Sequence, residues 1–116
     1  MAAPQIEAYR HGHIVIDGKA YKNDVVILPE TVRDWQRLKE GHRISGKDIA
    51  ALLREKPEVL IVGLGAGARL GLTKKAIARL EASGVEWHAF PSKEACKMYN
   101  RLSRQRRVVA ALHLAS

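Results

Sequence analysis

Cysteine and aromatic residues are scarce in this chain, and each shortage excludes some classes of protein. The single cysteine cannot form an internal disulfide, so we expect a protein of a reducing compartment, the cytoplasm, rather than a disulfide-stabilised secreted domain. Only 5% of the residues are aromatic, whereas 47% are hydrophobic. This composition excludes a disordered chain and predicts a core made mainly of Val, Ile, Leu and Ala.

Long apolar runs are absent as well. The longest, residues 59–67, falls well short of the ~20 residues that a membrane-spanning helix needs, so we expect no membrane span. The N-terminus has no positively charged segment followed by an apolar one, and we therefore expect no secretory signal. The length of 116 residues is that of one ordinary domain, which we expect to occupy residues 1–116 with residues 1–4 frayed.

Acidic residues are outnumbered, and the imbalance is concentrated in one segment. Twenty Lys and Arg against twelve Asp and Glu give a net charge of +8. Six of the basic residues lie between Lys93 and Arg107, where Glu94 is the one acidic residue. Such a patch attracts acidic proteins, polyanions or anionic lipid.

Strand and helix patterns alternate along the chain. The Asp17-Gly18 turn predicts an antiparallel hairpin in the first third, whereas residues 31–43 predict a loop or a short helical turn. From residue 45 onward the order is α-β-α-β-α-β, which implies parallel strands joined by crossover helices and therefore an α/β domain with a mixed sheet. Three helices are predicted: one begins after its cap Ser45, one begins after its cap Thr73, and one spans 94–103 after a turn and cap at Pro91-Ser92. The predicted strands are 6–10, 13–16, 19–22, 24–28, 58–62, 85–90 and 108–114.

A glycine-rich turn, Gly63-Leu64-Gly65-Ala66-Gly67, follows the strand at 58–62. Glycines at this position allow a backbone to approach a phosphate, as in dinucleotide-binding proteins. However, Thr73 caps the next helix several residues late, and the next strand ends at Phe90-Pro91-Ser92 without an acidic residue for a ribose. We favour a tight turn that needs glycine for its backbone. A small anion held by the turn together with Arg69 is the alternative.

The segment before the last strand predicts a helix with a basic stripe. Its four cations recur at intervals of three and four residues, which places them on one helical face. Nucleic-acid sites usually add stacking aromatic residues, but Tyr99 is predicted to point inward, so nucleic acid is not the expected partner. The stripe is interpreted as a solvated face or as a docking surface for an acidic protein, and it consists of Lys93, Lys97, Arg101 and Arg104.

The sequence identifies no catalytic residue, metal site or cofactor. His11 and His13 alternate on a predicted strand, but no third ligand accompanies them. His88 and His113 lie in predicted buried strands, where hydrogen-bonded structural histidines are common. Cys96 lies mid-helix near lysines that could lower its pKa, but a cysteine in this position is usually a small buried hydrophobe.

Several motifs, in their order and spacing, resemble those of the Mth938-like family (DUF498). They are Tyr21-x-x-Asp24-Val25, the run from Pro57 to Gly65, Leu80-x-x-x-Gly84-Val85, and a closing Tyr-Asn-x-Leu and Arg-x-Val-x-Ala-x-Leu-His between residues 99 and 113. Two departures are Ser92, where the family usually has threonine, and Gln105-Arg106, where Glu-Gly is common. The resemblance implies a three-layer α/β domain with a mixed sheet.

The same resemblance bears on function. Relatives in the family include a mitochondrial assembly factor for respiratory complex I and an animal protein linked to adipogenesis, which implies protein partners. Our leading hypothesis is therefore a non-enzymatic interaction or assembly factor that docks through the basic stripe. The rival is a small-molecule or anion-binding protein, or an unrecognised enzyme, with a pocket at the carboxyl ends of the parallel strands lined by Gly63, Gly65, Gly67, Arg69, Tyr99, Asn100 and Arg107.

Overall fold

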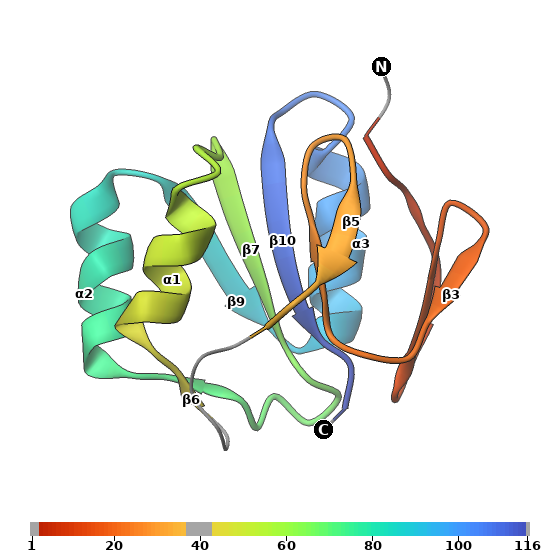
Figure 1. Ribbon diagram of the computed structural model, residues 1–116, viewed down its shortest axis with the longest axis horizontal. Coiled ribbons are helices and arrows are strands. Elements are labelled where there is room, and N and C mark those ends of the chain that lie inside the picture. Colours follow the sequence, from red (N-terminus) through yellow and green to blue (C-terminus); the bar gives the residue numbers. More distant parts are fainter. Residues whose placement is uncertain (1–2, 37–42, 116) are drawn as a thin grey trace.

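A five-stranded mixed sheet runs through the centre of the computed structural model (Figure 1), which describes residues 3–36 and 43–115. The strand order is β5-β4-β10-β7-β9. Strand β7 is parallel to both β10 and β9, whereas β4 is antiparallel to both β10 and β5. The bounds are β4 (Val25–Ile27), β5 (Val32–Asp34), β7 (Val59–Leu64), β9 (Glu86–Phe90) and β10 (Val108–His113).

The two central strands are apolar on both sides, because the sheet is covered on both faces. Five of the six residues in each of β7 and β10 are buried. Their side chains divide between two apolar clusters: Ile61 and Ala110 belong to one, and Leu60 and Val109 to the other. This pattern is typical of parallel strands between two helical layers, where a run of apolar residues replaces strict alternation.

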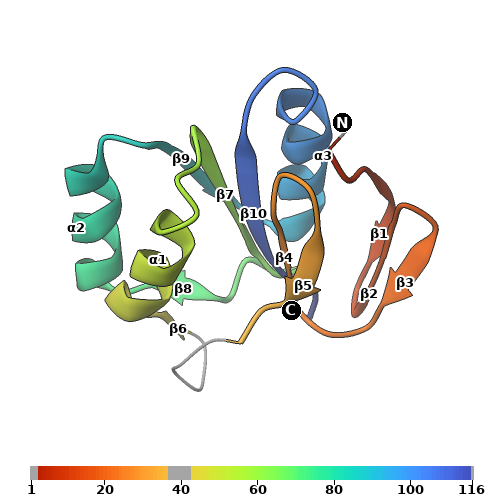
Figure 2. The same ribbon diagram turned by 45° about the horizontal axis from the view of Figure 1, so that its top comes forward.

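Three helices and a small second sheet form the covering layers. Helices α1 (Gly46–Leu53) and α2 (Lys74–Ser83) lie on one face, and α3 (Ser92–Leu102) lies on the other (Figure 1). A three-stranded antiparallel sheet packs beside α3, as Figure 2 shows most clearly, and consists of β1 (Ile6–Arg10), β2 (His13–Ile16) and β3 (Lys19–Tyr21). The predicted α/β fold with three layers and a mixed sheet is confirmed.

Local signals determine the ends of most elements. The Ser45 hydroxyl accepts the N–H of Asp48, and the Asp48 carboxylate accepts the N–H of Ser45, which completes a capping box on α1. The Thr73 hydroxyl accepts the N–H of Ala76 and caps α2 without a reciprocal bond, and Gly84 ends that helix in the left-handed region with φ 75°. The prediction was wrong at Ser92, which begins α3 after Pro91 and does not cap it.

Two further predictions need correction, and one pair of strands was missed. Part of the expected loop at 31–43 is strand β5, an edge strand that pairs with β4 and is half-buried or exposed throughout, so its residues show no alternation. A two-residue parallel pair, β6 (Arg43–Ile44) with β8 (Gly71–Leu72), was not predicted because it is too short for any periodicity. Pro4, which we expected in the frayed end, is buried, and its carbonyl accepts the Tyr99 hydroxyl.

Candidate functional site

The glycine turn after β7 is closed by its own hydrogen bonds. The N–H of Gly65 donates to the Ser92 hydroxyl at 2.9 Å, and the Gly65 carbonyl accepts the N–H groups of Ser92 and Ala68. Gly65 itself has φ 96°, a backbone conformation that favours glycine. A Cβ atom on Gly63 would lie 2.7 Å from the Ser92 oxygen. These contacts favour the structural interpretation of the glycines, which let the start of α3 approach the sheet.

Tyr99 and Asn100, expected to border an anion pocket, instead hold the first strand in place. Tyr99 is fully buried, and its hydroxyl donates to the Pro4 carbonyl at 2.7 Å. The Asn100 side chain accepts the N–H of Ile6 at 2.9 Å and donates to the Ile6 carbonyl at 2.7 Å. The amide of Asn100 thereby mimics a neighbouring strand and connects α3 to β1, whereas Tyr99 connects α3 to the segment just before that strand.

Arg107 lies at the opposite edge of the sheet from the glycine turn. It immediately precedes β10, whereas Gly65 follows β7, and these two strands are parallel. The Arg107 guanidinium donates to the carbonyls of Glu55 and Lys56 at 3.0 and 3.1 Å. The structure therefore does not bring Arg107 together with the glycine turn, and Gly67 and Arg69 lie near each other without it.

Three of the four residues of the basic stripe lie on α3, and Arg104 lies in the turn that follows the helix. The opposite side of this helix is buried, with Ala95, Cys96 and Tyr99 in the core. The four stripe residues are all exposed, and none forms an ion pair with any residue in the described ranges. This surface, which we call the α3 basic face, consists of Lys93, Lys97, Arg101 and Arg104.

His113 is paired with a carboxylate at the carboxyl end of β10. Its Nδ1 atom lies 2.7 Å from the carboxylate of Asp24, and the same carboxylate accepts the N–H of Leu114 at 2.9 Å. Both side chains are largely buried. His113 is thus a hydrogen-bonded histidine, as the sequence predicted, and its carboxylate partner was not identified beforehand.

The remaining histidines do not assemble a metal site within the described ranges. No group of three or more His, Cys, Asp or Glu side chains there could hold an ion. His88 lies 2.8 Å from the carboxylate of Glu86 on the edge strand β9, and it is half-buried rather than fully buried as predicted. His11 and His13 lie in the small sheet and its turn, and His42 is outside the described residues.

Cys96 is a buried apolar residue rather than a nucleophile. Burial raises the pKa of its thiol to about 12, so the thiolate is not formed near neutral pH. The lysines on the α3 basic face point away into solvent and do not offset that burial. The interpretation of Cys96 as a small hydrophobe is confirmed.

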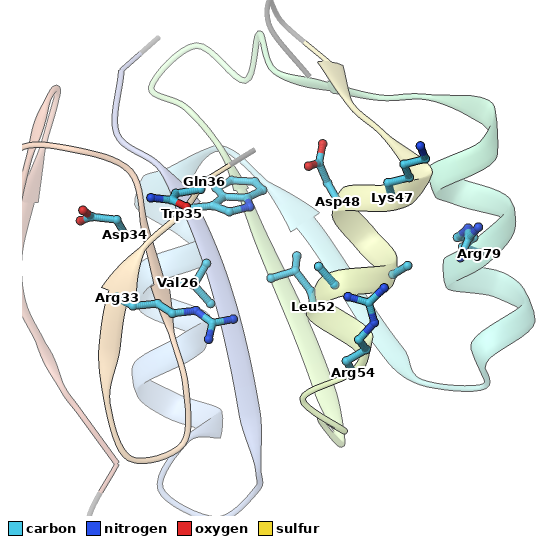
Figure 3. A pocket seen from close by; sticks show the side chains of 12 residues that line it. Val26, Arg33, Asp34, Trp35, Gln36, Lys47, Asp48, Leu52, Arg54 and Arg79 are labelled. Atoms are coloured by element: carbon cyan, nitrogen blue, oxygen red, sulfur yellow. The ribbon is translucent and has the colours of Figure 1, made fainter. Parts of the chain in front are cut away.

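One hollow in the structure was not predicted. It is a groove of about 730 Å³ between the β4–β5 hairpin and α1 (Figure 3). Arg33 of β5 extends across it toward α1, Arg54 lies on the facing wall at the end of α1, and Leu52 lies between the two arginines. Trp35 lines the same groove and is 9% exposed. No sequence motif links these residues, because strand and helix residues far apart in the chain meet only through the tertiary fold.

Comparison with known proteins assigns the chain to a family. The sequence model described as "Protein of unknown function (DUF498/DUF598)" matches residues 6–113. The chain belongs to this family. The predicted Mth938-like relationship is thereby confirmed, and no curated protein matches the sequence of this DUF498 member.

Solved structures with the same fold support the assignment. A conserved hypothetical protein, PH1505 of Pyrococcus horikoshii, is 29% identical with a TM-score of 0.85, covering 97% of this chain and 99% of the other. The protein MT938 is 25% identical with a TM-score of 0.79, covering 98% and 100%. A Mth938-like domain of Bordetella pertussis is 26% identical with a TM-score of 0.65, covering 96% and 85%.

Proposed function

We propose that this DUF498 protein is a non-enzymatic docking module that binds an acidic protein surface through the α3 basic face. The observation that carries the proposal is that three exposed cations of α3 and Arg104 in the turn after it form no ion pair with any residue in the described structure. Like charges one turn apart destabilise a helix by about 0.2–0.5 kcal/mol per pair. An acidic partner would remove this repulsion on binding.

The rigid attachment of α3 supports a docking role. Tyr99 and Asn100 fix the helix to β1 through hydrogen bonds, and Ser92 fixes its start to the sheet. A charged face held in one orientation loses little conformational freedom when a partner binds, so charge complementarity contributes more fully to affinity. Assembly of a respiratory complex, in the cytoplasm or at its membrane, is one setting for such docking. No helix of the described chain is long and apolar enough to cross a membrane.

Charge reversal tests the proposal. A tagged protein is used to capture partners from a nuclease-treated lysate of the native host at two salt concentrations, followed by mass spectrometry. We expect a stoichiometric partner that the triple variant Lys97→Glu, Arg101→Glu and Arg104→Glu no longer captures. The matched control reverses three exposed charges away from α3, at Lys22, Lys74 and Lys75, and should keep the partner.

Two outcomes contradict this proposal. In one, the partner binds the triple variant as well as it binds the wild type. In the other, material is captured only when the nuclease is omitted, which assigns the face to nucleic acid and predicts a steep dependence of affinity on salt. Circular dichroism of the triple variant establishes that the fold is retained.

A further inference from the structure

The groove between the β4–β5 hairpin and α1 has the size and shape of a small-molecule site. Its volume of about 730 Å³ lies within the range of ligand pockets, roughly 300–1,000 Å³. It lies on the face of the main sheet that α1 and α2 cover, whereas α3 covers the other face (Figure 1). The groove is therefore separate from the α3 basic face, and a partner docked on α3 would leave it open.

We propose that this groove binds an amphiphilic organic anion. The anionic head, a phosphate or a carboxylate, lies between the guanidinium groups of Arg33 and Arg54. The apolar body of the ligand lies on Trp35 and on the methyl groups of the α1 residues that line the groove. Figure 3 shows the Arg33 side chain reaching from the hairpin toward α1 and Arg54 on the opposite wall, with Leu52 between them.

The charges around the groove favour an anion. Its described lining includes four basic side chains, Arg33, Lys47, Arg54 and Arg79, against two acidic ones. One acid, Asp48, is engaged by Ser45 in the capping box of α1. The other, Asp34, points away from α1 in Figure 3. Guanidinium groups suit this role because their planar donors match phosphate and carboxylate oxygens.

One internal carboxylate competes for Arg33. Glu55 accepts a hydrogen bond from Arg33 at 3.2 Å, but the Arg33 side chain is 53% exposed. Exposed ion pairs of this kind contribute about 0–1 kcal/mol, so a ligand head group can displace Glu55 or share the guanidinium. Arg54 forms no ion pair with any residue that the structure describes.

The floor of the groove is part of the hydrophobic core. Val26, Trp35 and Leu52 all belong to the apolar cluster beneath α1 and α2. Because these side chains are packed, the groove keeps its shape without a ligand, which lowers the conformational cost of binding. The indole of Trp35 supplies a flat apolar surface for the ligand body and also a spectroscopic reporter.

Anilinonaphthalene sulfonate is a suitable probe, because it joins an aromatic body to one fixed negative charge. Trp87→Phe leaves Trp35 as the single tryptophan, whose fluorescence should be quenched in a saturable titration. The neutral analogue phenylnaphthylamine has the same body without the charge. In the Trp87→Phe background, Arg33→Gln with Arg54→Gln should weaken binding of the sulfonate by roughly tenfold, and binding of the neutral analogue by less than about twofold.

The control pair is Arg10→Gln with Lys19→Gln, which removes the same charge from the three-stranded sheet. It should leave the affinity for the sulfonate within about twofold of its starting value. An equal loss in both pairs would show a general charge effect and overturn the proposal. An equal loss for the sulfonate and the neutral analogue, or no quenching of Trp35, would also overturn it. Competition by inorganic phosphate or by a short-chain carboxylate then distinguishes the two head groups.

Discussion

The hydroxyl of Ser92 occupies the space in which a side chain on Gly63 would stand. A Cβ atom on Gly63 would lie 2.7 Å from the Ser92 oxygen and 2.8 Å from a methyl group of Leu112. The same hydroxyl donates to the His113 carbonyl at 2.6 Å and accepts the N–H of Gly65. One small side chain thus joins the ends of β7 and β10 to the start of α3, and it can do so only beside a glycine.

The first prediction concerns Gly63→Ala, which should destabilise the protein by about 1–3 kcal/mol because the added methyl forces buried atoms apart. Gly67→Ala is the matched control, since its Cβ would meet Arg69 atoms at 3.6 and 3.7 Å, ordinary contact distances. Urea unfolding of both variants measures the difference. Equal stabilities would show that the start of α3 can shift away from the sheet at little cost.

Arg107→Ala is predicted to lower stability by about 1 kcal/mol, because the two carbonyls of Glu55 and Lys56 lose a charged donor. Lys56 has φ 55°, a left-handed conformation that these bonds help to hold. Arg104→Ala removes a nearby exposed arginine without such bonds and should change the unfolding free energy by less than about 0.5 kcal/mol. If the two variants unfold alike, the guanidinium of Arg107 does not stabilise this turn.

The regular elements were predictable because their signals are local. Ser45 and Thr73 cap their helices, the Asp17-Gly18 turn lies at positive φ, and the apolar run in β7 indicates a buried strand. Strand β5 was missed because three residues, of which only Val32 is partly buried, show no alternation to detect. The six residues at 37–42 lie outside the described structure, so the rest of that predicted loop is not assessed.

The candidate sites also differ in how far the sequence alone could predict them. The α3 basic face follows from helical spacing alone, and all four of its residues are exposed, three on α3 and Arg104 in the turn after it. The sequence already argued against placing Arg107 beside the glycine turn. Arg107 precedes one predicted strand and the turn follows another, and in parallel strands these two positions lie at opposite edges of the sheet. The groove was not predictable, because Arg33 and Arg54 meet only when the hairpin packs beside α1.

Removal of the carboxylate beside His113 should also lower the stability of the protein. Asp24→Ala leaves the N–H of Leu114 and the His113 ring without their acceptor, which we expect to lower stability by about 1–3 kcal/mol. Asp34→Ala, at an exposed position of β5, is the control and should change stability by less than about 0.5 kcal/mol. Thermal unfolding of the two variants at equal pH provides the measurement, and a normal midpoint for Asp24→Ala would contradict the prediction.

The last prediction is a loss of stability at alkaline pH that depends on Cys96. Burial raises the pKa of its thiol from 9.0 to about 12. The native state therefore binds this proton more tightly than the unfolded chain does. Its stabilising contribution is complete below pH 9.0 and declines as the pH rises toward 12.

Cys96→Ala removes this titration, whereas Tyr99, whose pKa burial also raises to about 12, titrates in both proteins. The difference in unfolding free energy, wild type minus variant, should stay constant from about pH 7 to about pH 8.5 and then fall by up to about 1.4 kcal/mol per pH unit. Urea unfolding at several pH values measures it. A difference that stays flat to about pH 11 would mean that the thiolate is accommodated in the native core, against the burial of Cys96.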